Sequence, residues 1–107
     1  MVNKIFLIGR LTKDPELKYT KNGNAVSRMT IAVDRNYKDS EGKKKVDFIP
    51  LIAWRKLAEI VAEHMKKGKL ISVIGSLEIR SYEEQGEKKY ISEVIAEDIK
   101  FLDKVDK

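Results

Sequence analysis

Residues 49–59 read IPLIAWRKLAE, and within this stretch the sequence changes from the pattern of a strand to the pattern of a helix. Before the change, branched and apolar residues from Val46 to Trp54 predict a strand. After it, one apolar stripe with helical spacing comprises Leu57, Ile60, Val61, His64 and Met65. Lys66, Lys67 and Gly68 then predict the end of the helix. No other segment has a helix pattern of this quality, so its place among the strands decides the fold.

Four further segments have the two-residue period of strands: residues 3–11, 25–33, 69–82 and 89–102. Gly9 predicts a bulge or sharp bend, and Pro50 predicts an edge or bulged position. Asn22-Gly23 predicts a tight hairpin turn of the primed type before residue 25. Five strands with one helix between the third and fourth predict an all-β domain, a five-stranded Greek-key barrel of the OB type. A β-sandwich would need more strands than the sequence supplies.

Composition narrows the class of protein. A length of 107 residues predicts one domain over residues 1–107. The net charge of +5 favours a polyanionic partner, which includes nucleic acid, an anionic membrane surface or an acidic protein. The sequence has no cysteine, which excludes disulfides and thiolate metal sites and suits a reducing compartment. Without a signal-like or membrane-length apolar run, we expect a cytoplasmic protein that does not enter a membrane.

The alternation of side chains in the third strand bears on Trp54, the only tryptophan. Phe48, Pro50, Ile52 and Trp54 share one face of that strand, and Ile49, Leu51 and Ala53 share the other. The second set is small and aliphatic, as a narrow barrel interior requires, so the two aromatic residues are predicted to lie outside. Taken alone, a single tryptophan is more often a packing residue than a surface for a ligand.

Tyr37 and Tyr82 stand near the ends of the second and fourth strands, and we expect them on the same open side as Phe48 and Trp54. The polar and basic residues predicted around these rings are Arg28, Thr30, Lys43, Lys44, Lys45, Arg55, Lys56 and Arg80. Rings interleaved with cations suit unpaired bases, since stacking a base on an aromatic side chain is worth about 1–3 kcal/mol whatever the base. A run of three lysines is, alone, more often an ordinary solvated loop.

No catalytic, metal or cofactor site is predicted. His64 is the only histidine, and it falls on the apolar stripe of the helix, which predicts a packing or barrel-rim residue. The carboxylates are scattered among lysines, and the sequence has neither a nucleophile-elbow pattern nor a glycine-rich phosphate loop. We therefore expect a binding protein rather than an enzyme.

The sequence also resembles the bacterial and phage single-stranded DNA-binding proteins. The matching pieces are VNKIFLIGRLTKDPELKYT, NGNAVSRMTIAV, WRKLAEIVAEHMKKG and GSLEIRSYEEQGEKKY, in that order over nearly the whole chain. The resemblance implies an OB fold and wrapping of single-stranded DNA without sequence preference, in replication, recombination and repair near the nucleoid. It also implies a homo-oligomer, usually a tetramer, with the first strand around Lys4 to Leu7 at a subunit interface.

The same resemblance assigns roles to individual residues. Tyr37, Phe48 and Tyr82 stand where the family commonly carries stacking tryptophans, and Trp54 stands where it carries another aromatic residue. Lys56 and Arg80 match basic positions that touch phosphates. Family members typically continue into a flexible tail with an acidic tip that recruits partner proteins. This sequence ends at FLDKVDK, so recruitment through such a tip is not expected from it.

Three other functions stay open at this point. An OB domain for RNA, or an accessory protein of replication restart, would use the same face, with contacts to the 2′-hydroxyl favouring RNA. A protein-interaction module would use the exposed rings as an apolar interface. An enzyme is the remaining class.

Overall fold

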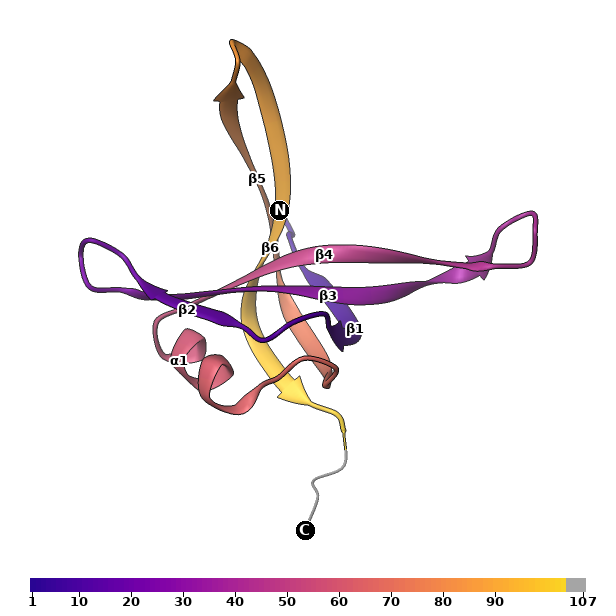
Figure 1. The fold of residues 1–107 in the computed structure, drawn as a ribbon, viewed down its shortest axis with the longest axis horizontal. Coiled ribbons are helices and arrows are strands. Elements are labelled where there is room, and N and C mark those ends of the chain that lie inside the picture. The colour runs from indigo at the N-terminus through magenta and orange to yellow at the C-terminus, as the bar shows by residue number, and fades with distance from the viewer. Residues whose placement is uncertain (104–107) are drawn as a thin grey trace.

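The computed structural model describes residues 1–103, and residues 104–107 lie outside that description. The described part contains six strands and one helix, and the helix follows the fourth strand (Figure 1). The strands are β1 (Ile5–Leu11), β2 (Glu16–Tyr19), β3 (Ala25–Lys38), β4 (Lys44–Trp54), β5 (Leu70–Glu84) and β6 (Glu87–Phe101), and the helix is α1 (Arg55–His64).

Five of these strands close into a barrel. The sheet runs in the order β1-β5-β6-β4-β3-β2, and β1 also pairs with β3, which closes the ring. All neighbours are antiparallel except β4 and β6, which pair in parallel through Leu51–Val94 and Ile52–Ile95. The expected Greek-key OB barrel is therefore confirmed, with the helix between its third and fourth strands. The short β2 is an additional strand that extends the sheet beyond β3.

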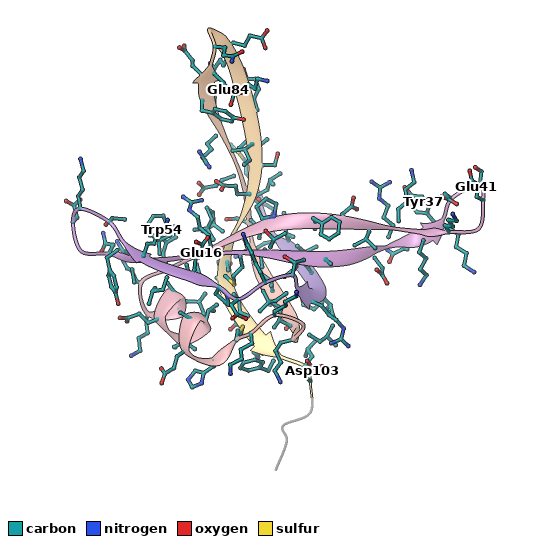
Figure 2. The ribbon with its side chains drawn as sticks, viewed as in Figure 1. Glu16, Tyr37, Glu41, Trp54, Glu84 and Asp103 are labelled. Carbon is teal, nitrogen blue, oxygen red and sulfur yellow. The ribbon has the colours of Figure 1, made fainter. Side chains whose placement is uncertain are left out.

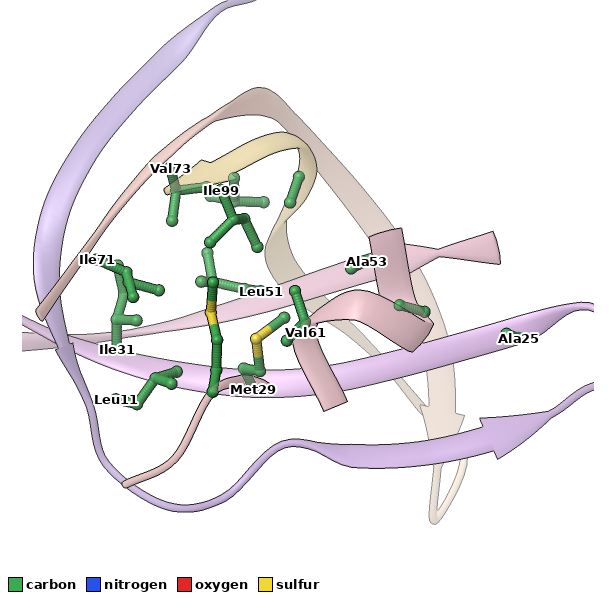
Figure 3. Close-up of a cluster of buried hydrophobic side chains, with 14 residues drawn as sticks. Leu11, Ala25, Met29, Ile31, Leu51, Ala53, Val61, Ile71, Val73 and Ile99 are labelled. Atoms are coloured by element: carbon green, nitrogen blue, oxygen red, sulfur yellow. The ribbon is translucent and has the colours of Figure 1, made fainter. Parts of the chain in front are cut away.

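The barrel interior is filled with aliphatic side chains and two methionines (Figure 3). Leu11, Ile31, Leu51, Ile71 and Val73 are fully buried there. α1 lies across one end of the barrel and contributes Ala58, Val61 and the following Met65 to the same cluster. The period-two pattern of each strand decides which residues enter this core, because alternate side chains point to opposite faces of a sheet.

Two glycines allow the strands to approach closely enough to close the barrel. A Cβ at Gly9 would lie 2.4 Å from the carbonyl oxygen of Ala32, and a Cβ at Gly75 would lie 2.2 Å from that of Ile95. Of the bulge or sharp bend expected at Gly9, the bulge is absent, since β1 pairs with β5 in unbroken register through this residue. The bulge is on β5 instead, where the register with β6 shifts between Ile74 and Gly75.

The helix differs from the expectation in its buried face and its end. Its buried residues are Ala58 and Val61, whereas Ile60 is exposed and the His64 side chain is 55% exposed. The small Ala58 side chain lets the helix lie close to the barrel, which turns the buried stripe away from Ile60 and His64. His64 is therefore not a packing residue. The helix ends at His64 rather than at Gly68, whose positive φ serves a later turn.

Two local expectations about turns and edges are resolved by backbone geometry. The β2–β3 hairpin is not closed by the expected two-residue primed turn: Thr20 and Asn24 flank a three-residue loop, in which only Gly23 has a positive φ. Gly23 N–H instead donates to Thr20 C=O, and Thr20 N–H donates to Asn24 C=O. Pro50 lies just before the parallel pairing of β4 with β6 begins, so its missing N–H falls at an edge.

Two long hairpins project from the barrel as arms (Figure 1). We call β3–β4 beyond Asp34 the first arm and β5–β6 beyond Arg80 the second arm. Each is built by strands of 11 to 15 residues, longer than the barrel needs. No helix in the described part of the chain is long and apolar enough to cross a membrane.

The close approach at Gly9 and Gly75 predicts their response to substitution. Gly9→Ala and Gly75→Ala should each lower the free energy of unfolding by about 2–3 kcal/mol, because the new methyl group meets a backbone carbonyl that cannot move aside. Gly86→Ala is the matched control, since its Cβ meets nothing within 4 Å and only its positive φ is unfavourable. Its cost should be about 1 kcal/mol. Urea unfolding measures all three, and equal losses would contradict the packing argument.

Candidate nucleic-acid interface

The outer face of the β3–β4 pair carries Phe48 and Trp54. The register Val26–Trp54, Arg28–Ile52, Thr30–Pro50 and Ala32–Phe48 is unbroken, so all these side chains share one face. The opposite face carries Met29, Ile31 and Leu51 into the core. Phe48 is 66% exposed and Trp54 is 41% exposed. The tryptophan is therefore not a core anchor, and the ring lies at the surface.

This exposure extends to every aromatic residue of the chain. The sequence has eight such residues (one Trp, four Tyr and three Phe), and all eight are exposed. A narrow barrel packed with aliphatic groups has no volume for a ring. Exposure alone therefore does not single out a binding residue here, and the arrangement of the rings and their charged neighbours has to do so.

Two arginines meet beside these rings on a common carboxylate. Arg28 on β3 donates through Nη1 to Oε2 of Glu93 at 3.2 Å, and Arg80 on β5 donates through Nε to Oε1 at 2.8 Å. Glu93 on β6 is only 5% exposed, whereas both arginine side chains are about half exposed. The hydrogen bond to Glu93 raises the pKa of the Arg80 guanidinium above its ordinary value, so the group stays charged at any physiological pH.

These residues line a shallow hollow where the barrel face meets the base of the second arm. The hollow has a volume of about 230 Å³ and is lined by Lys13, Glu16, Arg28, Met29, Thr30, Pro50, Leu51, Ile52, Arg80, Ile91 and Glu93. Tyr82 stands two residues beyond Arg80 on the same face of β5, paired with Lys89. The fold thus brings Arg28, Thr30 and Arg80 together at one hollow, and the strands β4 and β5 that border it carry Trp54 and Tyr82.

Tyr37 does not share this face. Its hydroxyl accepts a hydrogen bond from Arg35 Nη1, and Arg35 also forms a two-point ion pair with Asp47. Asp47 lies on the face of β4 opposite to Phe48, so Tyr37 is held on the other side of the first arm. The expectation that all four rings lie on one open side is therefore wrong for Tyr37. A register shift between Asp34 and Lys38 separates its position from the regular alternation nearer the barrel.

The Arg35–Asp47 pair remains ionised at neutral pH. The hydrogen bond from Arg35 lowers the pKa of the Asp47 carboxyl, and the bonds to Asp47 and Tyr37 raise the pKa of Arg35. Because the pKa of the Asp47 carboxyl is lower in the folded chain than in the unfolded chain, the ion pair with Arg35 stabilises the fold at neutral pH. It is lost as the pH falls through the lowered pKa of Asp47, and Tyr37 then loses its fixed neighbour.

The remaining predicted cations lie away from the hollow. Lys43, Lys44 and Lys45 are at or beside the tip of the first arm, near the labelled Tyr37 and Glu41 and far from Trp54 (Figure 2). Arg55 and Lys56 begin α1 directly after Trp54 and are exposed. Arg55 has a φ of 56°, which is unfavourable for any residue other than glycine.

Sequence reasoning missed two residues of this site. Glu93 was not predicted, although its alternation with Ile91 and Ile95 on one face of the strand is a signal for a buried charge with a partner. Ile52 shares the outer face but is only 4% exposed, because it lies in the floor of the hollow. Among residues 1–103, no three His, Cys, Asp or Glu side chains are grouped so that they could hold a metal ion.

Comparison with known proteins agrees with this geometry. A model of the single-strand binding protein family matches residues 2–102. The chain belongs to the single-strand binding protein family. A structure of a Plasmodium falciparum member in complex with single-stranded DNA superposes with a TM-score of 0.87, at 28% identity and over 96% of both chains.

Bacterial members are closer in sequence. The chain is 47% identical to a single-stranded DNA-binding protein of Caldanaerobacter subterraneus subsp. tengcongensis, over 96% of this chain and 69% of that protein. It is 52% identical to single-stranded DNA-binding protein 2 of Clostridium acetobutylicum, over 95% and 77% respectively. It is 48% identical to single-stranded DNA-binding protein A of Bacillus subtilis, over 96% of this chain and 60% of that member. These family members are longer than the present chain.

The backbone of Arg55 gives a prediction about stability. Arg55→Gly should raise the free energy of unfolding by about 0.5–1 kcal/mol, because glycine adopts this left-handed conformation without steric cost. Lys56→Gly, one residue further into the helix, should instead lower it by about 1 kcal/mol. Thermal and urea unfolding of both variants test this, and destabilisation by Arg55→Gly would show that the arginine side chain makes a compensating contact.

Proposed function

We propose that this chain binds single-stranded DNA without sequence preference and protects it during replication, recombination and repair. The observation that carries the proposal is the outer face described above, on which Phe48, Trp54 and Tyr82 flank an arginine pair. Membership of the single-strand binding protein family supports it, as does the likeness to a member in complex with single-stranded DNA.

The physical basis is the same for each base. Every base has a flat π-face, and stacking on a ring contributes about 1–3 kcal/mol with little dependence on sequence. Cations beside the rings take the phosphates and release counterions, which makes binding depend on salt. A duplex keeps its base faces inside its own stack, so this surface favours unpaired strands.

The proposed binding residues form a central and an outlying group. The central group comprises Arg28, Thr30, Phe48, Trp54, Arg80 and Tyr82. The outlying group comprises Tyr37, Lys43, Lys44 and Lys45 on the first arm and Arg55 and Lys56 on α1. A strand that leaves the central group along the first arm reaches Tyr37 only by passing around the edge of the arm.

We further propose that copies of the chain assemble into a homo-oligomer, with a tetramer as the family expectation. On the outer face of β1 and β5, Phe6 pairs with Ile74 and Ile8 lies beside them, and all three side chains are exposed. Within residues 1–103, the edge of β1 from Ile5 to Gly9 that faces away from β5 has no strand partner. An exposed apolar patch beside a free strand edge favours association between copies.

The proposal includes one binding domain, no catalytic activity and no cofactor, in the cytoplasm beside the DNA. Recruitment of other proteins through an acidic tail is not part of it, and the C-terminal residues beyond 103 lie outside the described structure.

RNA binding is the second candidate, since stacking does not distinguish RNA from DNA. Equal-length oligothymidine and oligouridine separate the two, with a strong preference for the RNA favouring the alternative.

Trp54 reports binding directly. Adding oligothymidine at low salt should quench the tryptophan fluorescence, because a base stacked on the indole removes excitation energy from it. The apparent affinity should fall as salt rises, since counterion release contributes to binding. Unchanged fluorescence together with no gel shift, at micromolar protein, would end the proposal. Fluorescence quenching that does not depend on salt would favour an apolar protein-interaction surface instead.

Stacking and charge can be separated by substitution at high salt. The double variant Phe48→Ala/Trp54→Ala should bind oligothymidine at least about 30-fold more weakly, because two stacking contacts are lost. Lys44→Ala should have little effect there, since salt screens a single exposed cation. Tyr19→Ala/Phe101→Ala is the matched control, because it removes two exposed rings outside the proposed face. A gel shift gives all four affinities, and equal losses in both double variants would contradict the assignment.

The oligomer proposal has its own test. Native mass spectrometry should show the wild-type protein as four copies of the 12.3 kDa chain. Phe6→Glu should shift it toward smaller species, because a carboxylate in an apolar interface is unfavourable. Phe101→Glu, at an exposed ring off the β1 patch, should leave the mass unchanged. A wild-type monomer at micromolar concentration would contradict this part of the proposal.

A further inference from the structure

The buried carboxylate of Glu93 is placed to hold two arginines in a fixed arrangement. Each of its oxygens accepts one hydrogen bond, from Arg28 on β3 and from Arg80 on β5. These strands are not neighbours in the sheet, because β6 and β4 lie between β5 and β3. Glu93 is therefore the bridge that brings the two guanidinium groups to one place.

The arrangement leaves most of the donors of both arginines available. A guanidinium has five N–H groups, and Arg28 uses Nη1 while Arg80 uses Nε for the carboxylate. In the described part of the chain, neither side chain makes a further hydrogen bond to protein. The Glu93 side chain is 6% exposed, whereas those of Arg28 and Arg80 are 53% and 52% exposed. Glu93 also lines the hollow, but because so little of its carboxylate is open to solvent, a ligand there meets chiefly the two cations.

The position of the pair on the face identifies what it would hold. Arg28 lies opposite Ile52, two residues before Trp54, and Arg80 lies two residues before Tyr82. A strand with one base on Trp54 and another on Tyr82 would pass its backbone over this point. A guanidinium group matches the geometry of a phosphate and can donate hydrogen bonds to two of its oxygens at once.

We propose that Glu93 is a positioning residue, which presents Arg28 and Arg80 as a two-armed clamp for one backbone phosphate between bases stacked on Trp54 and Tyr82. This inference rests on the proposed function and deepens it. It assigns the carboxylate a favourable role in binding a polyanion, even though its charge has the wrong sign for direct contact. Glu93 holds the side chains in place before the strand arrives, which reduces the entropy lost on binding.

Glu93→Gln distinguishes positioning from simple charge. The substitution keeps the size of the side chain and raises the net charge of +5 by one. If charge alone mattered, the variant would bind oligothymidine more tightly and with a steeper salt dependence. The clamp predicts the opposite, a loss of affinity of roughly three- to tenfold at moderate salt, because the arginines are no longer fixed.

Two controls make the result specific. Glu63→Gln changes the net charge equally, at a side chain on α1 that is 75% exposed, and should bind as tightly as wild type or slightly more tightly. Arg80→Lys should weaken wild-type binding several-fold, since lysine keeps the charge but has no planar fork. In the Glu93→Gln background, the same Arg80→Lys change should have almost no further effect. A merely structural role for Glu93 would leave the two losses additive.

The outcomes separate this inference from the function on which it rests. If wild type does not bind oligothymidine, the proposed function fails. If wild type binds and Glu93→Gln binds equally or more tightly, only the clamp is overturned, and Glu93 merely neutralises the two cations. If circular dichroism shows that Glu93→Gln does not fold, Arg28→Lys and Arg80→Lys in the wild-type background decide. Wild-type affinity in both would then overturn the clamp.

Discussion

Closure of a narrow barrel around aliphatic side chains is the constraint on which the rest of this structure depends. Closure needs two strands to pass with almost no space between their backbones, which glycine permits at Gly9 and Gly75. The interior then holds leucine, isoleucine, valine, alanine and methionine, and it has no volume for a ring. All eight aromatic side chains consequently remain outside, where an unpaired base can reach those on the proposed face.

The second constraint is electrostatic. A basic chain could bind a polyanion with lysines scattered over its surface, and such binding would be fast, weak and mobile. Here Arg28 and Arg80 are held in place instead, because they share a carboxylate that solvent scarcely reaches. Rings give affinity that survives salt, and fixed cations give the strand a defined path between them. The lysines at the tip of the first arm lie far from this point and add only general attraction.

The sequence predicted the fold because its signals were local. The period of the strands, the single helix and the alternation through Phe48 and Trp54 each depend on residues close together in the chain. Most of the sequence-based predictions that were wrong concern features that depend on packing between segments far apart in the chain. The bulge lies at Gly75 on β5 rather than at Gly9, and the buried stripe of the helix is turned toward Ala58. Tyr37 is the exception, because the contact that holds it on the far face is local: Arg35, two residues earlier in β3, donates to its hydroxyl. Glu93 binds Arg28, which lies 65 positions away in the sequence, and Arg80, which lies 13 positions away, so no local pattern reveals the bridge.

The most direct test of the account is to map which exposed rings touch the strand. Oligothymidine carrying 5-iodouracil, irradiated in complex with the protein, forms covalent bonds to the aromatic side chains against which its bases lie. Mass spectrometry of the digested complex then locates them among eight exposed rings that serve as controls for one another. The account predicts bonds to Phe48, Trp54 and Tyr82. Bonds chiefly to Tyr19, Tyr90 or Phe101, or an even spread over all eight, would contradict it.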